Sequence, residues 1–175
     1  GTTVVKNSKN TGNINGKGKA GGFAAQTKGN ITLQNCTNTA VVKATDAVYK
    51  NGKAEKTAMA GGFIGVGAGN VNIEDSTVNG AIQGNNAVYG GGVVAYYSGT
   101  KFVAKNVTTD YTHNVDGAWQ VVGGGFIGTL ANDSAECYFT DCVNNTNITK
   151  GGNPGGFIGG TVKTDGGMWN AKSVT

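Results

Sequence analysis

Short stretches that alternate apolar and polar residues recur along the chain. Residues 31–36, 71–76 and 137–142 each alternate over four positions and then end on a small Ser or Cys residue. This two-residue period is typical of β-strands with one buried face. A weaker copy occupies residues 101–106, with Val103 in an apolar position. Six positions beyond the small residue, each clear copy is followed by an apolar residue that predicts a second strand: Val42, Ile82 and Ile148.

A second string, Gly-Gly-Phe-Ile-Gly, separates these stretches. It is complete at three places and degenerate at two, at intervals of 30 to 40 residues: 21–25, 61–65, 91–95, 124–128 and 155–159. A string that recurs at such a period is typical of a repeat architecture. The sequence therefore predicts one repeat domain over residues 1–175 with five anchors. We expect this domain to be a segment of a larger protein.

Each repeat contains three strand candidates in about 30 residues. The sequence contains 32 glycines, one proline and no arginine, and it is poor in Leu and Glu, so helix is disfavoured. We predict an all-β fold, a parallel β-solenoid of about five coils with three short strands per coil and hairpin insertions. Equivalent strands of successive coils would then lie about 4.8 Å apart.

The aromatic position of the repeated string predicts a column of stacked core residues: Phe23, Phe63, Val93, Phe126 and Phe157. The two glycines before it are expected to permit positive φ at a corner and close approach of neighbouring backbones. The small residue two positions after the aromatic would leave room for the ring. If the strand continues through the string, the next side chains point outward and form an apolar stripe, which is either an interface or lies beneath a folded-over segment: Ile64, Val94, Ile127 and Ile158.

Two insertions carry strong hairpin signals. Residues 48–53 contain Asn-Gly and residues 114–119 contain Asp-Gly, each between strand-like flanks. Projecting loops often carry function. The candidate ligand-contact residues on these hairpins are Tyr49, His113 and Trp119, with His113 expected to be a loop residue.

The charge pattern excludes some partners. The net charge is +4 and every cation is a lysine. Arginine is the usual reader of guanine edges and the usual bidentate phosphate ligand, so its absence argues against sequence-specific nucleic-acid binding. No apolar run approaches the length of a membrane span. We therefore expect neither nucleic-acid binding nor membrane insertion.

The sequence offers little support for catalysis. Asp75 and Asp141 occupy equivalent repeat positions, and we interpret them as solvated turn residues. Three cysteines without a Cys-x-x-Cys pair, and one histidine, give poor support for a metal site. Cys36 and Cys142 are expected to be small inward residues too far apart for a disulfide, and a strained Cys137–Cys142 bridge stays open. We predict no enzyme activity, no catalytic residue, no metal and no cofactor.

The succession of these strings resembles the GLUG-motif repeats of bacterial secreted and cell-surface proteins. The resemblance covers most of the chain, although Phe stands where that motif often has Leu. It implies a β-solenoid segment of an extracellular surface protein. The leading hypothesis is a non-catalytic structural or adhesive element, a stalk, surface layer or filament that associates with itself or with neighbouring repeats. The alternative is a glycan-binding adhesin module that uses the hairpin residues to bind a host or surface glycan. A polysaccharide-active enzyme ranks third.

The ends of the sequence bear on assembly. The chain opens in the middle of a repeat, and residues 168–173 look like the start of another. A solenoid without polar caps exposes unpaired strand edges. We therefore expect either further repeats in the parent protein or end-to-end stacking of copies.

Overall fold

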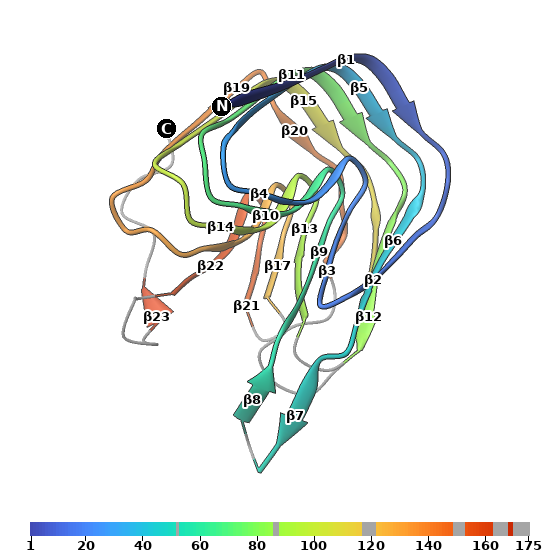
Figure 1. The fold of residues 1–175 in the computed structure, drawn as a ribbon, viewed down its shortest axis with the longest axis vertical. Helices are drawn as coiled ribbons and strands as arrows, with labels where there is room; N and C mark the ends of the chain where they lie inside the picture. Colours follow the sequence, from blue (N-terminus) through green and yellow to red (C-terminus); the bar gives the residue numbers. More distant parts are fainter. Residues whose placement is uncertain (52, 86–87, 117–121, 149–152, 163–167, 170–175) are drawn as a thin grey trace.

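The computed structural model describes residues 1–51, 53–85, 88–116, 122–148, 153–162 and 168–169. Within these residues the chain forms strands and no helix, wound as a parallel β-solenoid of five turns (Figure 1). The predicted fold class is therefore confirmed. No helix of the described chain is long and apolar enough to cross a membrane.

Four parallel sheets run along the solenoid, and each complete coil contributes one strand to each sheet. Sheet A contains β1 (Thr2–Asn10), β5 (Asn30–Asn38), β11 (Val71–Val78), β15 (Lys101–Thr109), β19 (Glu136–Thr140) and β20 (Val143–Asn144). Sheet B contains β2 (Ile14–Lys17), β6 (Val41–Thr45), β12 (Ala81–Asn85) and β16 (Thr112–Asp116). Sheet C contains β3 (Lys19–Gly21), β9 (Ala58–Gly61), β13 (Val88–Gly91), β17 (Val122–Gly124) and β21 (Asn153–Gly155). Sheet D contains β4 (Ala24–Thr27), β10 (Ile64–Gly67), β14 (Val94–Tyr97), β18 (Ile127–Leu130) and β22 (Ile158–Val162).

The coil has an L-shaped outline. In Figure 1, sheet A crosses the top of the view and sheet B descends on the right, while sheets C and D lie inside this outline and meet near the centre. The bend between sheets C and D falls on the repeated Gly-Gly-Phe-Ile-Gly string. The string is therefore two strands with a corner between them, which is why each coil has four strands and not the expected three.

Backbone hydrogen bonds define this corner. The N–H groups of Phe63 and Ile64 both donate to the carbonyl oxygen of Val93 in the next coil, at 3.1 and 2.8 Å. The same paired donation occurs at the other corners, from residues 23 and 24 to Phe63, from 93 and 94 to Phe126, and from 126 and 127 to Phe157. In a continuous strand successive N–H groups point to opposite sides. Here they converge, so successive side chains do not alternate between faces.

This geometry corrects the predicted outward stripe. Ile64, Val94 and Ile127 are completely buried in the core, and Ile158, in the last coil, is half-buried against it. The prediction assumed that the strand continued through the string. Because the chain bends there, both the aromatic residue and the residue after it reach the interior.

The predicted column of core residues is observed. Phe63, Val93 and Phe126 are completely buried, and Phe23 and Phe157, in the first and last coils, are half-buried against them. The rings of Phe23 and Phe63 have centroids 5.4 Å apart, and those of Phe126 and Phe157 stack at 4.8 Å. Burial of this apolar surface is the main driving force for stacking the coils.

Side-chain volume is compensated between neighbouring core positions of sheet A. The inward pair is Phe102 and Ala104 in β15, and Cys137 and Phe139 in β19. The phenylalanine therefore occupies the first inward position in β15 and the second in β19. The summed side-chain volume of the two positions is nearly the same in both coils. Phe102 lies 5.6 Å from the Tyr97 ring, between centroids.

The weaker copy in β15 lies in a different register from the one expected. Phe102 pairs with Val71, and Ala104 with Ile73, so these two residues face the core while Val103 faces outward. The sequence alignment placed Val103 in the core position, one residue away. A one-residue shift exchanges the two faces of a strand. The expected register placed Lys101 at the first core position. In the observed register Lys101 is exposed and precedes that position, which Phe102 occupies.

The corner glycines act through close approach of backbones and not through positive φ. A Cβ atom on Gly61 would overlap the carbonyl oxygen of Ile64 across the corner, and one on Gly62 would overlap the carbonyl oxygen of Gly92 in the next coil. A Cβ on Gly65 would lie 2.7 Å from the carbonyl oxygen of Ala20. The small residue after the aromatic therefore makes room for neighbouring backbone rather than for the ring. Among the described glycines, only Gly18 has a positive φ, of 81°.

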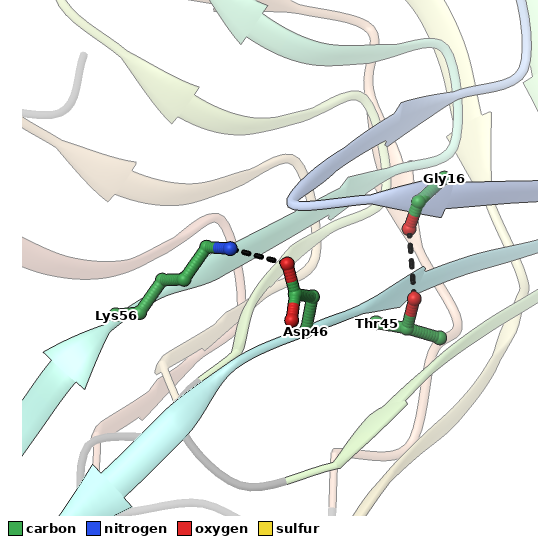
Figure 2. Close-up of polar contacts among 4 residues, drawn as sticks. All are labelled: Gly16, Thr45, Asp46 and Lys56. Atoms are coloured by element: carbon green, nitrogen blue, oxygen red, sulfur yellow. Dashed lines mark hydrogen bonds and ion pairs between the residues drawn. The ribbon is translucent and has the colours of Figure 1, made fainter.

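The first insertion forms the predicted hairpin. Strands β7 (Val48–Lys50) and β8 (Lys53–Lys56) pair antiparallel and project from the bottom of the coil in Figure 1. At its base, shown in Figure 2, the Lys56 ammonium pairs with the Asp46 carboxylate, which lowers the pKa of Asp46. Thr45 Oγ1 donates to the Gly16 carbonyl oxygen at 3.3 Å and joins the base to the preceding coil.

The last described strand does not begin a further parallel coil, contrary to the expectation for residues 168–173. Strand β23 (Met168–Trp169) runs antiparallel to β22, with Thr161 opposite Trp169. It therefore pairs with the edge that sheet D would offer to a following parallel strand. Residues 170–173 lie outside the described part of the chain.

We predict that Gly62→Ala destabilises the protein by about 3 kcal/mol, because the added methyl overlaps backbone that cannot move without breaking the corner. Gly12→Ala is the control, since its Cβ would have only Asn10 Oδ1 nearby, at 3.9 Å. Chemical denaturation followed by circular dichroism measures both. Equal stability of the two variants would contradict the close-approach role of the corner glycine.

Candidate functional site

His113, a predicted ligand contact, lies in the core. It belongs to β16 and pairs in register with Ile82 of the previous coil, so it takes the inward position of an aliphatic column. Its side chain is 7% exposed and its ring lies against Gly90 and Gly123. Ile148 lies beside the same Gly123. The prediction of a loop residue is wrong because His113 lies within β16 of sheet B, which continues to Asp116. The rest of the predicted hairpin, residues 117–119, lies outside the described residues.

The environment of His113 strongly disfavours its charged form. Among the described residues, neither ring nitrogen has a hydrogen-bond partner. Burial without a counter-charge lowers the pKa of His113 to about 4. The neighbouring Tyr111 ring lies 5.9 Å away between centroids, and its hydroxyl donates to the Gly124 carbonyl oxygen instead. His113 is thus a neutral core residue and not a ligand contact.

The other two predicted ligand contacts are not placed. Trp119 lies outside the described residues, as does the side chain of Tyr49 on β7. Their proposed role in ligand binding stays a prediction.

A column of Asn and Asp residues marks a left-handed backbone position in each coil of sheet A. One such residue in each coil has φ between 49° and 52°: Asn7, Asn35, Asp75, Asn106 and Asp141. Asn and Asp tolerate this left-handed conformation better than other non-glycine residues. The Asn35 amide donates to Asn7 Oδ1, and the Asn106 amide donates to Asp75 Oδ1, both at 2.8 Å. Asp75 and Asp141 are exposed, in agreement with their interpretation as turn residues.

The small residue after this left-handed position donates a hydrogen bond back across it. Ser76 Oγ donates to the Glu74 carbonyl oxygen at 2.6 Å and accepts from the Cys36 N–H at 3.0 Å. Ser8, Cys36 and Cys142 likewise donate to the carbonyl oxygen two residues before them. This bond explains why the position holds Ser or Cys in four of the five coils, since both carry a donor on a short side chain. In the fourth coil Val107 occupies the position.

The described residues offer no reactive or metal-binding cluster. Cys36, Cys137 and Cys142 are free thiols, so the Cys137–Cys142 bridge is absent. Burial raises the pKa of Cys137 to about 11, which disfavours the nucleophilic thiolate. No group of three or more His, Cys, Asp or Glu side chains in the described chain is placed to hold a metal ion.

The first coil presents an open surface. Strands β1, β2, β3 and β4 each have a partner on one side only. The core columns end there on the half-buried side chains of Val5, Ile14 and Phe23. Unpaired strand edges beside apolar side chains are a template for further strand pairing.

A shallow groove of about 310 Å³ crosses the outer face of sheet A. Its lining spans β1, β5, β11 and β15, and its polar members are Thr2, Asn30, Thr32, Asn70, Asn72 and Lys101. Sequence reasoning missed it because its residues belong to the polar half of each alternation. The recurrence of Asn immediately before the first apolar residue, at Asn30 and Asn70, was the signal that could have indicated it.

Comparison with known proteins adds no relative. No protein-family model, curated protein or solved structure matches the chain. The resemblance to GLUG-motif repeats therefore stays a prediction.

We predict that the stability of the protein falls by about 3 kcal/mol between pH 6.5 and pH 4 through His113 alone. In this range the unfolded histidine binds a proton and the folded one does not, so lowering the pH favours unfolding. Below about pH 4 the folded histidine is protonated as well and this contribution levels off. His113→Ile, which copies Ile82, should be more stable and should lose this part of the pH dependence. Urea titrations at several pH values test it, and an unchanged pH profile in the variant would contradict it.

We predict that Ser76→Ala costs about 2 kcal/mol, because it leaves the Cys36 N–H and the Glu74 carbonyl without their bonds in a buried site. Ser76→Cys should retain most of the stability, since Cys occupies the same position in β5. Thermal unfolding of the two variants makes the comparison. If both lose the same stability, the hydrogen bond is not the reason for the residue choice.

Proposed function

We propose that the chain is a non-catalytic structural or adhesive β-solenoid that works as a stalk, surface-layer or filament element. The observation that supports this most directly is the open first coil, where four strand edges surround an apolar core end. Such an end favours continuation by another coil. An extracellular or cell-surface location and a bacterial origin rest on the resemblance to GLUG-motif repeats.

Stacking along the solenoid axis is better supported than lateral association. Lateral contact was expected through the stripe at Ile64, Val94, Ile127 and Ile158, which lies in the core or against it. The strand edges of the first described coil, in contrast, lie at the end of the stack and fit a further coil, either of the same protein or of a second copy. The glycan-binding alternative through the hairpins loses one of its three residues, because His113 is buried.

Self-association is tested by sedimentation velocity and negative-stain microscopy of the purified chain across a range of concentrations. We expect oligomers that grow with concentration. Ile14→Lys places a charge on the exposed end of a core column and should prevent association. Thr108→Lys is the control, because Thr108 belongs to β15, which is paired with a neighbouring coil on both sides and lies away from the first coil.

Both variants must retain the far-ultraviolet circular dichroism spectrum of the unmodified chain. A chain that remains monomeric at all concentrations would contradict the proposal. Equal loss of association in the two variants would also contradict it, because a non-specific charge effect would then explain the result.

A further inference from the structure

The groove on the outer face of sheet A presents an ordered set of hydrogen-bonding groups. Asn30 Oδ1 accepts from the Asn70 N–H at 3.0 Å, and Asn70 Oδ1 accepts from Thr100 Oγ1 at 3.0 Å. Both amide oxygens are thereby occupied. Among the described residues neither Nδ2 has a protein partner, so two residues that line the groove in successive coils each keep an amide donor for a ligand.

The adjacent row is also polar. Thr32 and Asn72 pair in register on neighbouring strands, and their side chains point to the outer face. Asn72 Nδ2 donates to Glu74 Oε1 at 3.2 Å, which leaves Asn72 Oδ1 as an acceptor. The groove therefore combines amide donors, an amide acceptor and threonine hydroxyls. These are the groups that hydrogen-bond the hydroxyl groups of sugars.

One positive charge lies at the end of the groove. The Lys101 ammonium lies over the Tyr138 ring, 5.5 Å from its centroid. Glu136, which pairs in register with Lys101, accepts a hydrogen bond from the Tyr138 hydroxyl at 3.1 Å. Lys101 forms no ion pair among the described residues, and no carboxylate belongs to the groove lining. The groove lining thus contains one cation, which has a ring contact but no ion pair, among neutral residues.

We propose that this groove binds an acidic polysaccharide, a chain of sugars that contains uronic acid. The groove spans three inter-strand steps, about 14 Å, which accommodates a short run of sugar rings. Lys101 pairs with a uronate carboxylate, and Asn30 and Asn70 donate to sugar oxygens. This function does not depend on the proposed stacking of separate copies of the chain.

Other partners fit the groove less well. A nucleic acid carries a phosphate at every nucleotide and is bound through several cations, whereas this groove has one lysine and the chain has no arginine. A protein partner would be anchored by buried aromatic or arginine side chains, and the groove lining contains neither.

The test is fluorescence anisotropy with labelled oligogalacturonate. Its methyl ester supplies the same sugar without charge, and a single-stranded oligonucleotide supplies a phosphate polyanion. We expect the oligogalacturonate to bind, and the ester and the oligonucleotide to bind more weakly. Lys101→Gln should weaken binding about tenfold, the size expected for one charge-assisted hydrogen bond. Thr32→Trp should abolish binding by filling the groove.

Two matched controls keep the result specific. Lys105→Gln removes the same charge from the same strand, and Thr37→Trp places the same ring on β5, both outside the groove. Neither should change affinity, and thermal unfolding must show that all four variants fold. The proposal is overturned by an absence of oligogalacturonate binding, by equal binding of the ester, by tighter binding of the oligonucleotide, or by equal losses in the groove variants and their controls.

Discussion

The fold depends on the close approach of backbones at the corner between sheets C and D. There the carbonyl oxygen of one coil accepts two consecutive N–H groups from the coil before it, as Val93 does from Phe63 and Ile64. Only residues without a Cβ fit beside these bonds, which is why the two glycines recur in every coil. The corner therefore fixes the register of the strands directly before and after it, in sheets C and D.

This constraint explains how much of the fold was predictable. The repeat of the string predicted the five coils and the column from Phe23 to Phe157, because side chains at equivalent positions must stack in a solenoid. The burial of Ile64 was not predictable by alternation, since alternation holds only within a continuous strand. The register of β15 was missed for a related reason. Phe102 and Ala104 exchange large and small side chains between neighbouring core positions, so no single position kept its size.

The candidate site was less predictable than the fold, because core residues repeat and surface residues do not. The hairpin at residues 48–53 followed from its Asn-Gly turn, whereas the Asp-Gly signal near His113 did not describe residues 114–116, which extend sheet B. The sequence shows His113 as the one histidine of the chain, but only its register with Ile82 reveals that it is buried. The groove at Asn30 and Asn70 depends on side chains from four coils that are far apart in sequence.

The central claim is that two consecutive N–H groups in each corner converge on one carbonyl oxygen. Scalar couplings across hydrogen bonds, measured by nuclear magnetic resonance, test this residue by residue because they identify the acceptor of each N–H group. The structure predicts that both amide nitrogens of each pair, residues 63 and 64, 93 and 94, and 126 and 127, couple to the same carbonyl carbon, that of residue 93, 126 and 157 respectively. If the two amides of a pair coupled to carbonyl carbons of opposite neighbouring coils, the corner would be a continuous strand and the account would be wrong.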